Sequence, residues 1–281
     1  MFMLPQKLDA TNREVKLYNN DGKLKLRVEF DSITLQPHFF DTDNKPIESP
    51  YTIESFYIPN GKHFLNGWML KSKKIEPKAL LLHLHGNAGN LLYQFSAIDD
   101  LVEKGFQICI FDYSGFGFST GKPTQKQVLK DAKCILNFII KENENTKLPI
   151  IIYGQSLGGH LAVELGRLHE MQISGIVIEG AFSSHRDIAY YTMKKTSHLG
   201  FLGRLFVSSR YMASTAIKKI NKPLLVIHSS EDETIPLYMG KRIFENANEP
   251  KEFYLIDGCH ICGPSLYADS IATRMKNLFG L

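Results

Sequence analysis

Residues 153–159 read Tyr-Gly-Gln-Ser-Leu-Gly-Gly. An apolar run over residues 150–153 precedes it, and a helix-compatible pattern over residues 157–170 follows it. Ser156 therefore stands between a buried strand and a helix, which is the context of the G-x-S-x-G nucleophile elbow. Such a sharp turn needs small neighbours, and the glycines of the motif supply that room.

The chain around this motif alternates between two kinds of segment. Short apolar runs predict buried strands at residues 79–84, 106–111, 150–153, 175–178, 224–227 and 252–256. Helix-compatible stretches lie between them, at residues 91–104, 124–142, 157–170, 237–246 and 265–279. Strands that alternate with helices predict an α/β fold in which a mostly parallel sheet is flanked by helices.

Residues 1–60 follow a different pattern. Leu24, Leu26, Val28 and Phe30 alternate with charged residues, which is typical of a half-buried strand. The same pattern continues over residues 52–58 and 66–70, with a turn signal at Asn60-Gly61 between them. We expect residues 1–60 to form an extension of antiparallel strands that packs on or joins the sheet of a catalytic domain at residues 61–281.

Residues 181–222 interrupt the alternation. This connection between two strands is rich in aromatic residues and has no strand pattern. Connections of such length usually have helices of their own or a functional role. We expect a short lid within the catalytic domain, with candidate substrate-binding residues Tyr190, Tyr191, Phe201 and Phe206.

A serine hydroxyl is a weak nucleophile until a base, itself oriented by an acid, removes its proton. The strand predicted at residues 224–227 leads into a loop that contains Asp232, and the strand at 252–256 leads into His260. Their order after Ser156 is the order that this kind of strand–turn–helix site uses. We therefore predict the triad Ser156, Asp232 and His260.

Other titratable residues lie near these positions. Glu231 and Glu233 flank Asp232, but their side chains should project in other directions. Asp257 is placed to shape the turn before His260, and His228 is interpreted as a packing residue. Other histidines are interpreted as strand-border, surface or core residues, namely His83, His85, His160, His169, His185 and His198.

Attack on an acyl carbon creates an oxyanion that preorganised N–H groups must bind. One donor is expected to be the backbone N–H of Leu157, the residue after the nucleophile. The second is expected from the Gly-rich loop at residues 85–90, where we favour Asn87 and keep Ala88 as the alternative.

The four cysteines do not indicate a disulfide framework. Cys109 and Cys134 lie in apolar runs and are interpreted as core residues. Cys259 and Cys262 form a C-x-x-C pair, but a zinc site would need a second ligand pair at a suitable spacing. We expect no metal and no cofactor.

The net charge of +4 is small and no block of like charges occurs, which argues against nucleic-acid binding. A lysine-rich stretch is interpreted as a solvent-exposed helix face. The alternative is that these lysines bind acidic substrates or lipid head groups, which would give weak peripheral membrane contact. The stretch contains Lys194, Lys195, Lys218, Lys219 and Lys222. No apolar stretch is long enough for a membrane span, and the N-terminus lacks signal-peptide character, so we expect a cytoplasmic protein.

Four segments carry a family resemblance: residues 83–90, 111–119, 154–159 and 228–236. They resemble the α/β-hydrolase superfamily over about residues 60–281, and are most similar to its esterase- and thioesterase-like α/β-hydrolase-domain branch, which includes protein depalmitoylases. That branch often has Gly at the position of Ser229 and Arg at that of Ser114, differences that concern loop packing rather than the triad. Many of its members carry an N-terminal membrane anchor, which is not expected here.

The resemblance implies an α/β-hydrolase fold and acyl-enzyme chemistry on Ser156. Superfamily members that use an Asp nucleophile are excluded by the serine. We predict a hydrolase of carboxylic esters or thioesters that acts on a small-molecule or acylated substrate. A peptidase, an acyltransferase or perhydrolase with the same triad, and a non-catalytic binding protein are the alternatives. The oligomeric state is not indicated.

Overall fold

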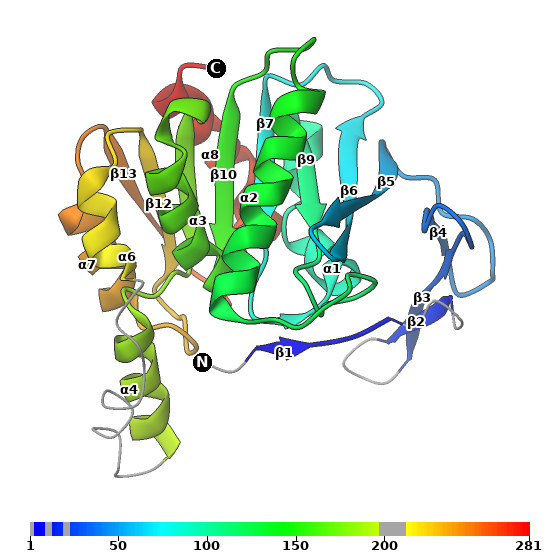
Figure 1. The fold of residues 1–281 in the computed structure, drawn as a ribbon, viewed down its shortest axis with the longest axis horizontal. Coiled ribbons are helices and arrows are strands. Elements are labelled where there is room, and N and C mark those ends of the chain that lie inside the picture. Colours follow the sequence, from blue (N-terminus) through cyan, green and yellow to red (C-terminus); the bar gives the residue numbers. More distant parts are fainter. Residues whose placement is uncertain (1–2, 9–12, 19–22, 197–211) are drawn as a thin grey trace.

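A computed structural model describes residues 3–8, 13–18, 23–196 and 212–281 (Figure 1). Within these residues the main sheet has the strand order β13-β12-β11-β10-β7-β9-β6-β5. Neighbouring strands are parallel from β13 to β9, and the two pairings that involve β6 are antiparallel. The predicted α/β-hydrolase fold, with its mostly parallel sheet and antiparallel N-terminal strands, is confirmed.

The bounds of the elements follow the sequence pattern closely. The strands of the main sheet are β5 (Tyr51–Asn60), β6 (His63–Ser72), β7 (Ala79–Leu84), β9 (Phe106–Phe111), β10 (Ile150–Gln155), β11 (Gly175–Glu179), β12 (Leu224–Ser229) and β13 (Lys251–Ile256). The helices are α1 (Leu91–Gln94), α2 (Gln125–Glu142), α3 (Leu157–Leu168), α4 (His185–Thr196), α6 (Ala213–Ala216), α7 (Leu237–Asn246) and α8 (Gly263–Phe279). Strands β1 (Leu4–Pro5) and β8 (Ala88–Gly89) form a small parallel pair apart from this sheet.

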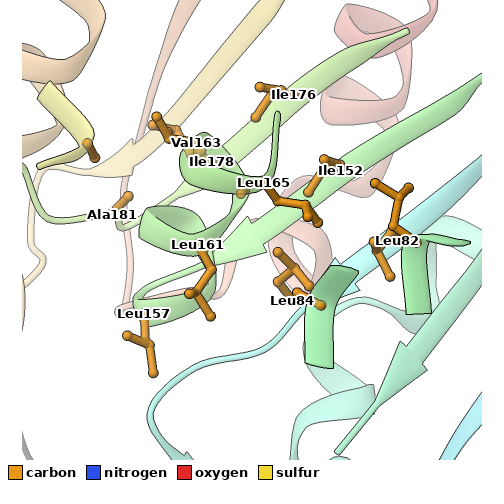
Figure 2. Packing of buried hydrophobic residues seen from close by; sticks show 14 of the residues in the cluster. Leu82, Leu84, Ile152, Leu157, Leu161, Val163, Leu165, Ile176, Ile178 and Ala181 are labelled. Atoms are coloured by element: carbon orange, nitrogen blue, oxygen red, sulfur yellow. The ribbon is translucent and has the colours of Figure 1, made fainter. Parts of the chain in front are cut away.

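Two hydrophobic layers cover the two faces of the main sheet. Alternate strand residues such as Leu82 and Leu84 pack with α2, α3 and α7, while Leu81 packs with α8 on the other face. Figure 2 shows the first layer, where Leu161 and Leu165 of α3 lie among the strand side chains. Because burial of apolar area is the main stabilising term of folding, these layers hold the strand ends in fixed positions.

The N-terminal strands form a separate three-stranded antiparallel sheet of β2 (Glu14–Tyr18), β3 (Leu24–Phe30) and β4 (Pro37–Phe40). Its inner residues Val28 and Phe30 are buried in the second layer, next to Trp68 of β6. The hairpin of β5 and β6 spans the expected boundary at residue 60, and both of its strands belong to the main sheet.

The single helix expected over residues 91–104 is not formed. Helix α1 covers its first turn only, and two 3₁₀ turns, Phe95–Ala97 and Asp99–Lys104, follow it. The break lies at Ile98, whose φ of −142° and ψ of −21° are outside the helical region. Ile98 is fully buried, so packing against the sheet overrides the helical pattern of the sequence here.

The predicted lid, residues 181–222, contains α4, α6 and a 3₁₀ turn at Ile217–Lys219 within its described parts. Helix α4 extends below the body of the molecule in Figure 1. Phe201 and Phe206 lie outside the described residues. Among the helices that the structure describes, none has the length and apolar character needed to cross a membrane.

Candidate active site

Ser156 occupies a sharp turn between β10 and α3. Its φ of 55° and ψ of −115° are unusual for a residue with a side chain, and such strain is typical of functional turns. The turn is held by a hydrogen bond of 2.8 Å from the Ser156 N–H to the carbonyl oxygen of Glu179. The serine is therefore placed by the backbone of two adjacent strands, β10 and β11.

The elbow is packed too closely to allow side chains at its glycines. A Cβ at Gly158 would stand 1.7 Å from the carbonyl oxygen of Leu84, and one at Gly154 would stand 2.2 Å from that of Gly158. Both distances are far shorter than any real carbon–oxygen contact. The small residues of the motif are thus required by backbone packing.

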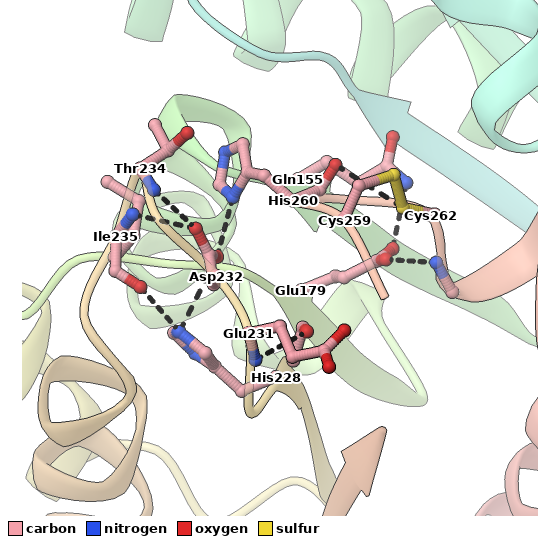
Figure 3. A network of polar contacts seen from close by, with 12 residues as sticks. Gln155, Glu179, His228, Glu231, Asp232, Thr234, Ile235, Cys259, His260 and Cys262 are labelled. Atoms are coloured by element: carbon pink, nitrogen blue, oxygen red, sulfur yellow. Dashed lines mark hydrogen bonds and ion pairs between the residues drawn. A yellow bond between two sulfur atoms is a disulfide. The ribbon is translucent and has the colours of Figure 1, made fainter. Parts of the chain in front are cut away.

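Asp232 and His260 follow the next strands of the sheet, β12 and β13. Oδ2 of Asp232 lies 2.6 Å from Nδ1 of His260 (Figure 3). Oδ1 of Asp232 accepts hydrogen bonds from the N–H groups of Thr234 at 2.9 Å and Ile235 at 2.8 Å. The carboxylate is thereby oriented from both sides, and it fixes the plane of the imidazole ring.

The hydrogen bonds at Asp232 also set its charge. Burial raises the pKa of this carboxyl, but the hydrogen bonds from His260 and from the N–H groups of Ile235 and Thr234 outweigh burial and leave the pKa below its ordinary value. Asp232 is therefore an anion at neutral pH, as an acid that orients a histidine must be.

The other ring nitrogen of His260, Nε2, is buried and has no hydrogen-bond partner among the described residues. The ring lies against Gly180, where a Cβ would stand 2.8 Å from Cε1 of His260. Gly180 directly follows Glu179, whose carbonyl oxygen binds the N–H of Ser156. The imidazole is thus on the same strand-end edge as the serine, with one nitrogen available for proton transfer.

The competing side chains have other partners. Glu231 accepts a hydrogen bond from the N–H of Gly258 at 2.9 Å, and Asp257 accepts one from the Ser230 hydroxyl at 2.6 Å. Their described contacts thus hold the loops on either side of Asp232 and His260.

His228, which the sequence suggested is a packing residue, also has polar contacts in the loop that carries Asp232. Its Nε2 lies 2.9 Å from the carbonyl oxygen of Ile235 and 3.6 Å from Oδ2 of Asp232. Since that carbonyl can only accept, Nε2 carries the proton, and burial lowers the pKa of the ring. His228 is a neutral support of the acid loop.

The loop that follows β7 lies beside the elbow. The position of a Cβ on Gly86 is 3.7 Å from Cβ of Ser156. The carbonyl oxygen of Gly86 contacts Nδ1 of His85 at 2.8 Å, and that of Asn87 accepts a hydrogen bond from the N–H of Leu4 at 3.0 Å. Leu157 begins α3, where the first backbone N–H groups have no acceptor within the helix. The Leu157 N–H thus follows the serine directly and the loop that contains Asn87 lies beside it, while the role of both as oxyanion donors stays a prediction.

A buried polar cluster beneath the site was missed from the sequence. Oε1 of Glu179 accepts a hydrogen bond of 2.6 Å from the N–H of Gly263, and Oε2 accepts one of 2.9 Å from the Tyr153 hydroxyl. Oε2 also accepts from the Gln155 amide at 2.8 Å (Figure 3). Burial raises the pKa of Glu179. Because Gly263 starts α8 three residues after His260, Glu179 anchors the histidine loop. The only sequence signal was an acidic residue at the end of an apolar strand.

Cys259 and Cys262 form a disulfide across His260, with their Cα atoms 5.6 Å apart. Composition had predicted no disulfide framework, and this bridge closes a single turn rather than joining distant segments. Cys109 is buried, as expected of a core residue. Within the described residues, no three His, Cys, Asp or Glu side chains converge in a way that could hold a metal ion.

The predicted substrate-binding residues are placed only in part. Tyr190 and Tyr191 lie on α4 and are half-buried, and Tyr191 packs against the first hydrophobic layer. Their role in substrate binding stays a prediction.

Comparison with known proteins identifies the family of this chain. A family described as serine aminopeptidase, S33, matches residues 75–218. The chain belongs to this family of α/β hydrolases. The matched region contains the elbow and the Gly-rich loop, while the predicted acid and base lie beyond it.

Proteins with related sequences come from bacteria and eukaryotes. The uncharacterized protein YfhR of Escherichia coli (strain K12) is 31% identical over 219 residues, which is 75% of each chain. The human alpha/beta hydrolase domain-containing protein 17B is 30% identical over 200 residues, or 71% of this chain and 65% of that protein.

Solved structures of similar fold come from an archaeon and a bacterium. Esterase Pf2001 of Pyrococcus furiosus has a TM-score of 0.66 and 20% identity, covering 83% of this chain and 95% of its own. Est1E of Butyrivibrio proteoclasticus, solved with ferulic acid bound, has a TM-score of 0.65 and 16% identity, covering 80% of this chain and 100% of its own. At these identities the likeness establishes the fold.

Proposed function

We propose that this α/β hydrolase cleaves carboxylic esters or thioesters through an acyl-enzyme on Ser156. The observation that carries the proposal is the 2.6 Å contact between Asp232 and Nδ1 of His260, which leaves the buried Nε2 available beside the strained serine turn. In this proposal the side chains at the ends of β10, β12 and β13 act as nucleophile, acid and base, respectively. The esterase-like structural neighbours support the same choice of chemistry.

In the proposed acylation step, Nε2 of His260 takes the proton of the Ser156 hydroxyl as Oγ attacks the acyl carbon. The N–H groups of Leu157 and Asn87 bind the oxygen that becomes negative, a contribution of about 3–4 kcal/mol per donor. Collapse of the tetrahedral intermediate breaks the bond to the alcohol or thiol, which leaves with the proton from His260. Asp232 stabilises the imidazolium that forms between these two transfers.

Deacylation repeats the sequence with water. His260 takes a proton from a water molecule, the hydroxide oxygen attacks the acyl carbon, and Ser156 leaves with the proton that His260 returns. If an alcohol or peroxide replaces water in this step, the same site performs acyl transfer. Product analysis in the presence of added alcohol distinguishes transfer from hydrolysis.

The proposal is tested with the purified full chain and a fluorophosphonate probe, together with p-nitrophenyl esters and an acyl thioester. Labelling is expected on Ser156, and Ser156→Ala should lose both the label and hydrolysis. Ser270→Ala is the matched control, because Ser270 is an exposed serine on α8. If Ser156→Ala hydrolyses these substrates as fast as the unsubstituted protein, the proposal is wrong.

A second candidate, removal of N-terminal amino acids from peptides, is favoured by the description of the matched family. The same acyl-enzyme steps apply, with the peptide amine as leaving group. Aminoacyl p-nitroanilides distinguish the two candidates: a peptidase cleaves them at rates comparable to its best ester, and an esterase does not.

A further inference from the structure

The C-x-x-C pair of the sequence lies on either side of the expected base. Cys259 and Cys262 are bridged, and His260 stands between them (Figure 3). We propose that the two cysteines are a redox-modification site whose reaction partner is a dithiol, and that reduction of the bridge releases His260 from Asp232 and lowers activity. The inference rests on the proposed function, because it takes His260 as the base.

The backbone holds the two cysteines at a separation that suits a disulfide. Their Cα atoms are 5.6 Å apart, within the range of about 4.4–6.8 Å for protein disulfides. The bridge joins residues that are three apart in sequence, so it ties together one loop and no distant segments. Opening it should therefore leave the sheet and its helices folded.

The two sulfur atoms differ in their access to a reductant. Cys259 is exposed and lines an open groove of about 660 Å³, together with Gly258 and residues 230–233. Cys262 is buried, with 7% of its surface exposed. Thiol–disulfide exchange requires an attacking thiolate to reach one of the two sulfurs. A dithiol in the groove can attack Cys259, and Cys262 is then the leaving sulfur.

Reduction takes place in two exchange steps. In the first, one thiolate of the reductant attacks Sγ of Cys259, the bond to Cys262 breaks, and the released Cys262 thiolate takes up a proton. In the second, the other thiolate of the reductant attacks its partner sulfur in the mixed disulfide, and Cys259 leaves as a thiolate that takes up a proton. The protein gains two electrons and two protons, and the dithiol becomes a disulfide. A disulfide oxidant reverses both steps.

The loop that contains His260 is anchored at both ends. At its start, the Gly258 N–H donates to the Glu231 carboxylate at 2.9 Å. At its end, the Gly263 N–H donates to the Glu179 carboxylate at 2.6 Å. The bridge joins the residue after the first anchor to the residue before the second. It thus closes a small ring around His260 and its neighbour Ile261.

Ile261 has an unfavourable backbone conformation within this ring. Its φ of 56° is in the left-handed region, which β-branched residues rarely adopt. Without a restraint, such a residue favours negative φ by a factor of about 5–30. The closed ring restrains this rotation. Because Gly263 is fixed at the start of α8, rotation about φ of Ile261 in the open form moves the preceding residue, His260.

Movement of His260 separates it from Asp232. The contact of 2.6 Å between Nδ1 and Oδ2 orients the ring, and Nε2 has no partner among the described residues. The elbow of Ser156 is held by backbone packing and should stay in place. Because His260 acts in proton transfer, reduction should lower kcat and change KM less.

The first experiment compares the full chain in its two redox forms. The protein is equilibrated with dithiothreitol or with the cyclic disulfide of this reagent, desalted under argon, and assayed with p-nitrophenyl acetate. Unfolding and alkylation should modify four cysteines in the reduced form, but only Cys109 and Cys134 in the oxidised form. Reduction should lower kcat by about tenfold and leave the circular dichroism unchanged.

Two results overturn the redox inference alone. One is a kcat that is equal or higher in the reduced form although the thiol content differs. The other is alkylation of all four cysteines after every treatment with the cyclic disulfide. If neither form hydrolyses the ester and neither is labelled at Ser156 by the fluorophosphonate probe, the proposed function fails and the redox inference fails with it.

The second experiment fixes the open state by substitution. Cys259→Ser replaces an exposed sulfur, so the fold should be retained. This variant should have the lower kcat of the reduced protein after both treatments. Cys134→Ser is the matched control, because Cys134 is a partly exposed free cysteine on α2. It should keep the response of about tenfold. A Cys259→Ser variant as active as the oxidised protein overturns the inference.

The third experiment tests whether Ile261 drives the change. Glycine adopts positive φ about as readily as negative φ, so in Ile261→Gly the ratio of kcat between oxidised and reduced forms should fall to about twofold. Ile261→Ala keeps a Cβ that disfavours positive φ, and its ratio should stay near tenfold. The same ratio in both folded variants would overturn the proposed mechanism.

Discussion

The two halves of the candidate site are held in place by different forces. The serine half, from β10 through the elbow to α3, is held by backbone packing: a Cβ at Gly158 would stand 1.7 Å from the Leu84 carbonyl, and the first ten residues of α3 are buried. The histidine half follows β12 and β13, at the edge of the sheet. There the loops are held mainly by hydrogen bonds to side chains, from His260 to Asp232 and from Gly263 to Glu179.

The difference predicts two kinds of mutational effect. Changes in the serine half should act on the whole fold, because close packing of backbone cannot relax around added atoms. Changes in the histidine half should lower activity more than stability, because the loops can shift while the sheet stays folded.

Among these substitutions, Asp232→Asn should have the largest effect on activity. It changes the histidine half alone and should therefore lower activity without lowering stability. The amide oxygen can still accept from Thr234 and Ile235, but the charge that orients and stabilises protonated His260 is lost. We expect kcat for a p-nitrophenyl ester to fall by about 10⁴, as in other triads, with little change in melting temperature. Asp257→Asn, in the same pair of loops, is the control and should stay within about twofold.

Gly158→Ala should show the opposite behaviour, with a large loss of stability. The added Cβ forces the elbow away from β7, which we expect to cost about 3 kcal/mol and to lower the melting temperature by about 6–12 °C. Gly86→Ala is the control for stability, since its Cβ would find its nearest neighbour at 3.7 Å. Equal melting temperatures for the two variants would contradict the close-packing explanation.

Glu179→Gln tests the anchor between the halves. The three groups that bind this side chain all donate to it, so the amide NH₂ of Gln would face a donor. We expect about 1–3 kcal/mol of lost stability and a kcat lowered by about tenfold. Glu245→Gln, on the exposed face of α7, is the control. A changed pH–rate profile in Glu179→Gln alone would identify a positioning role, whereas a lower melting temperature with unaltered kinetics would argue against it.

A further prediction concerns the pH dependence of stability. Asp112 follows β9, and burial raises its pKa to about 8. The hydrogen bond from the Leu91 N–H and the attraction of Lys7 lower the pKa but do not offset burial. The folded state then binds a proton that the unfolded state releases above about pH 4, so stability should fall as pH rises from about 4 to 8. Asp232 has the opposite sign: its lowered pKa contributes stability above about pH 4 that is lost on acidification below that value.

Urea unfolding of the protein and of Asp112→Asn between pH 5 and pH 9 measures this difference. The Asn side chain keeps an acceptor for Leu91 but does not titrate. The unsubstituted protein should lose more stability over this range than Asp112→Asn. Parallel curves would mean that Asp112 does not titrate in the window assigned to it.

The periodicity of apolar residues was sufficient to predict most strands and helices of the fold. The apolar run at Phe106–Phe111 and the amphipathic helix at Leu237–Asn246 have the expected bounds, because side-chain periodicity reports directly on which face is buried. The pattern failed at Ile98, where contact with the sheet decides the backbone conformation.

By itself, the sequence determined the fold class, the elbow at Ser156 and the candidates Asp232 and His260, since each of these depends on residues close together in the chain or on strand order. Only the tertiary structure decided that Asp232 rather than Asp257 contacts His260, that Glu179 anchors the histidine loop, and that Met3 and Leu4 lie beside Leu157 and Asn87. The physical reason is that these contacts join segments separated by up to about 150 residues. Chain periodicity carries no record of such distances, and only packing of the whole sheet brings the segments together.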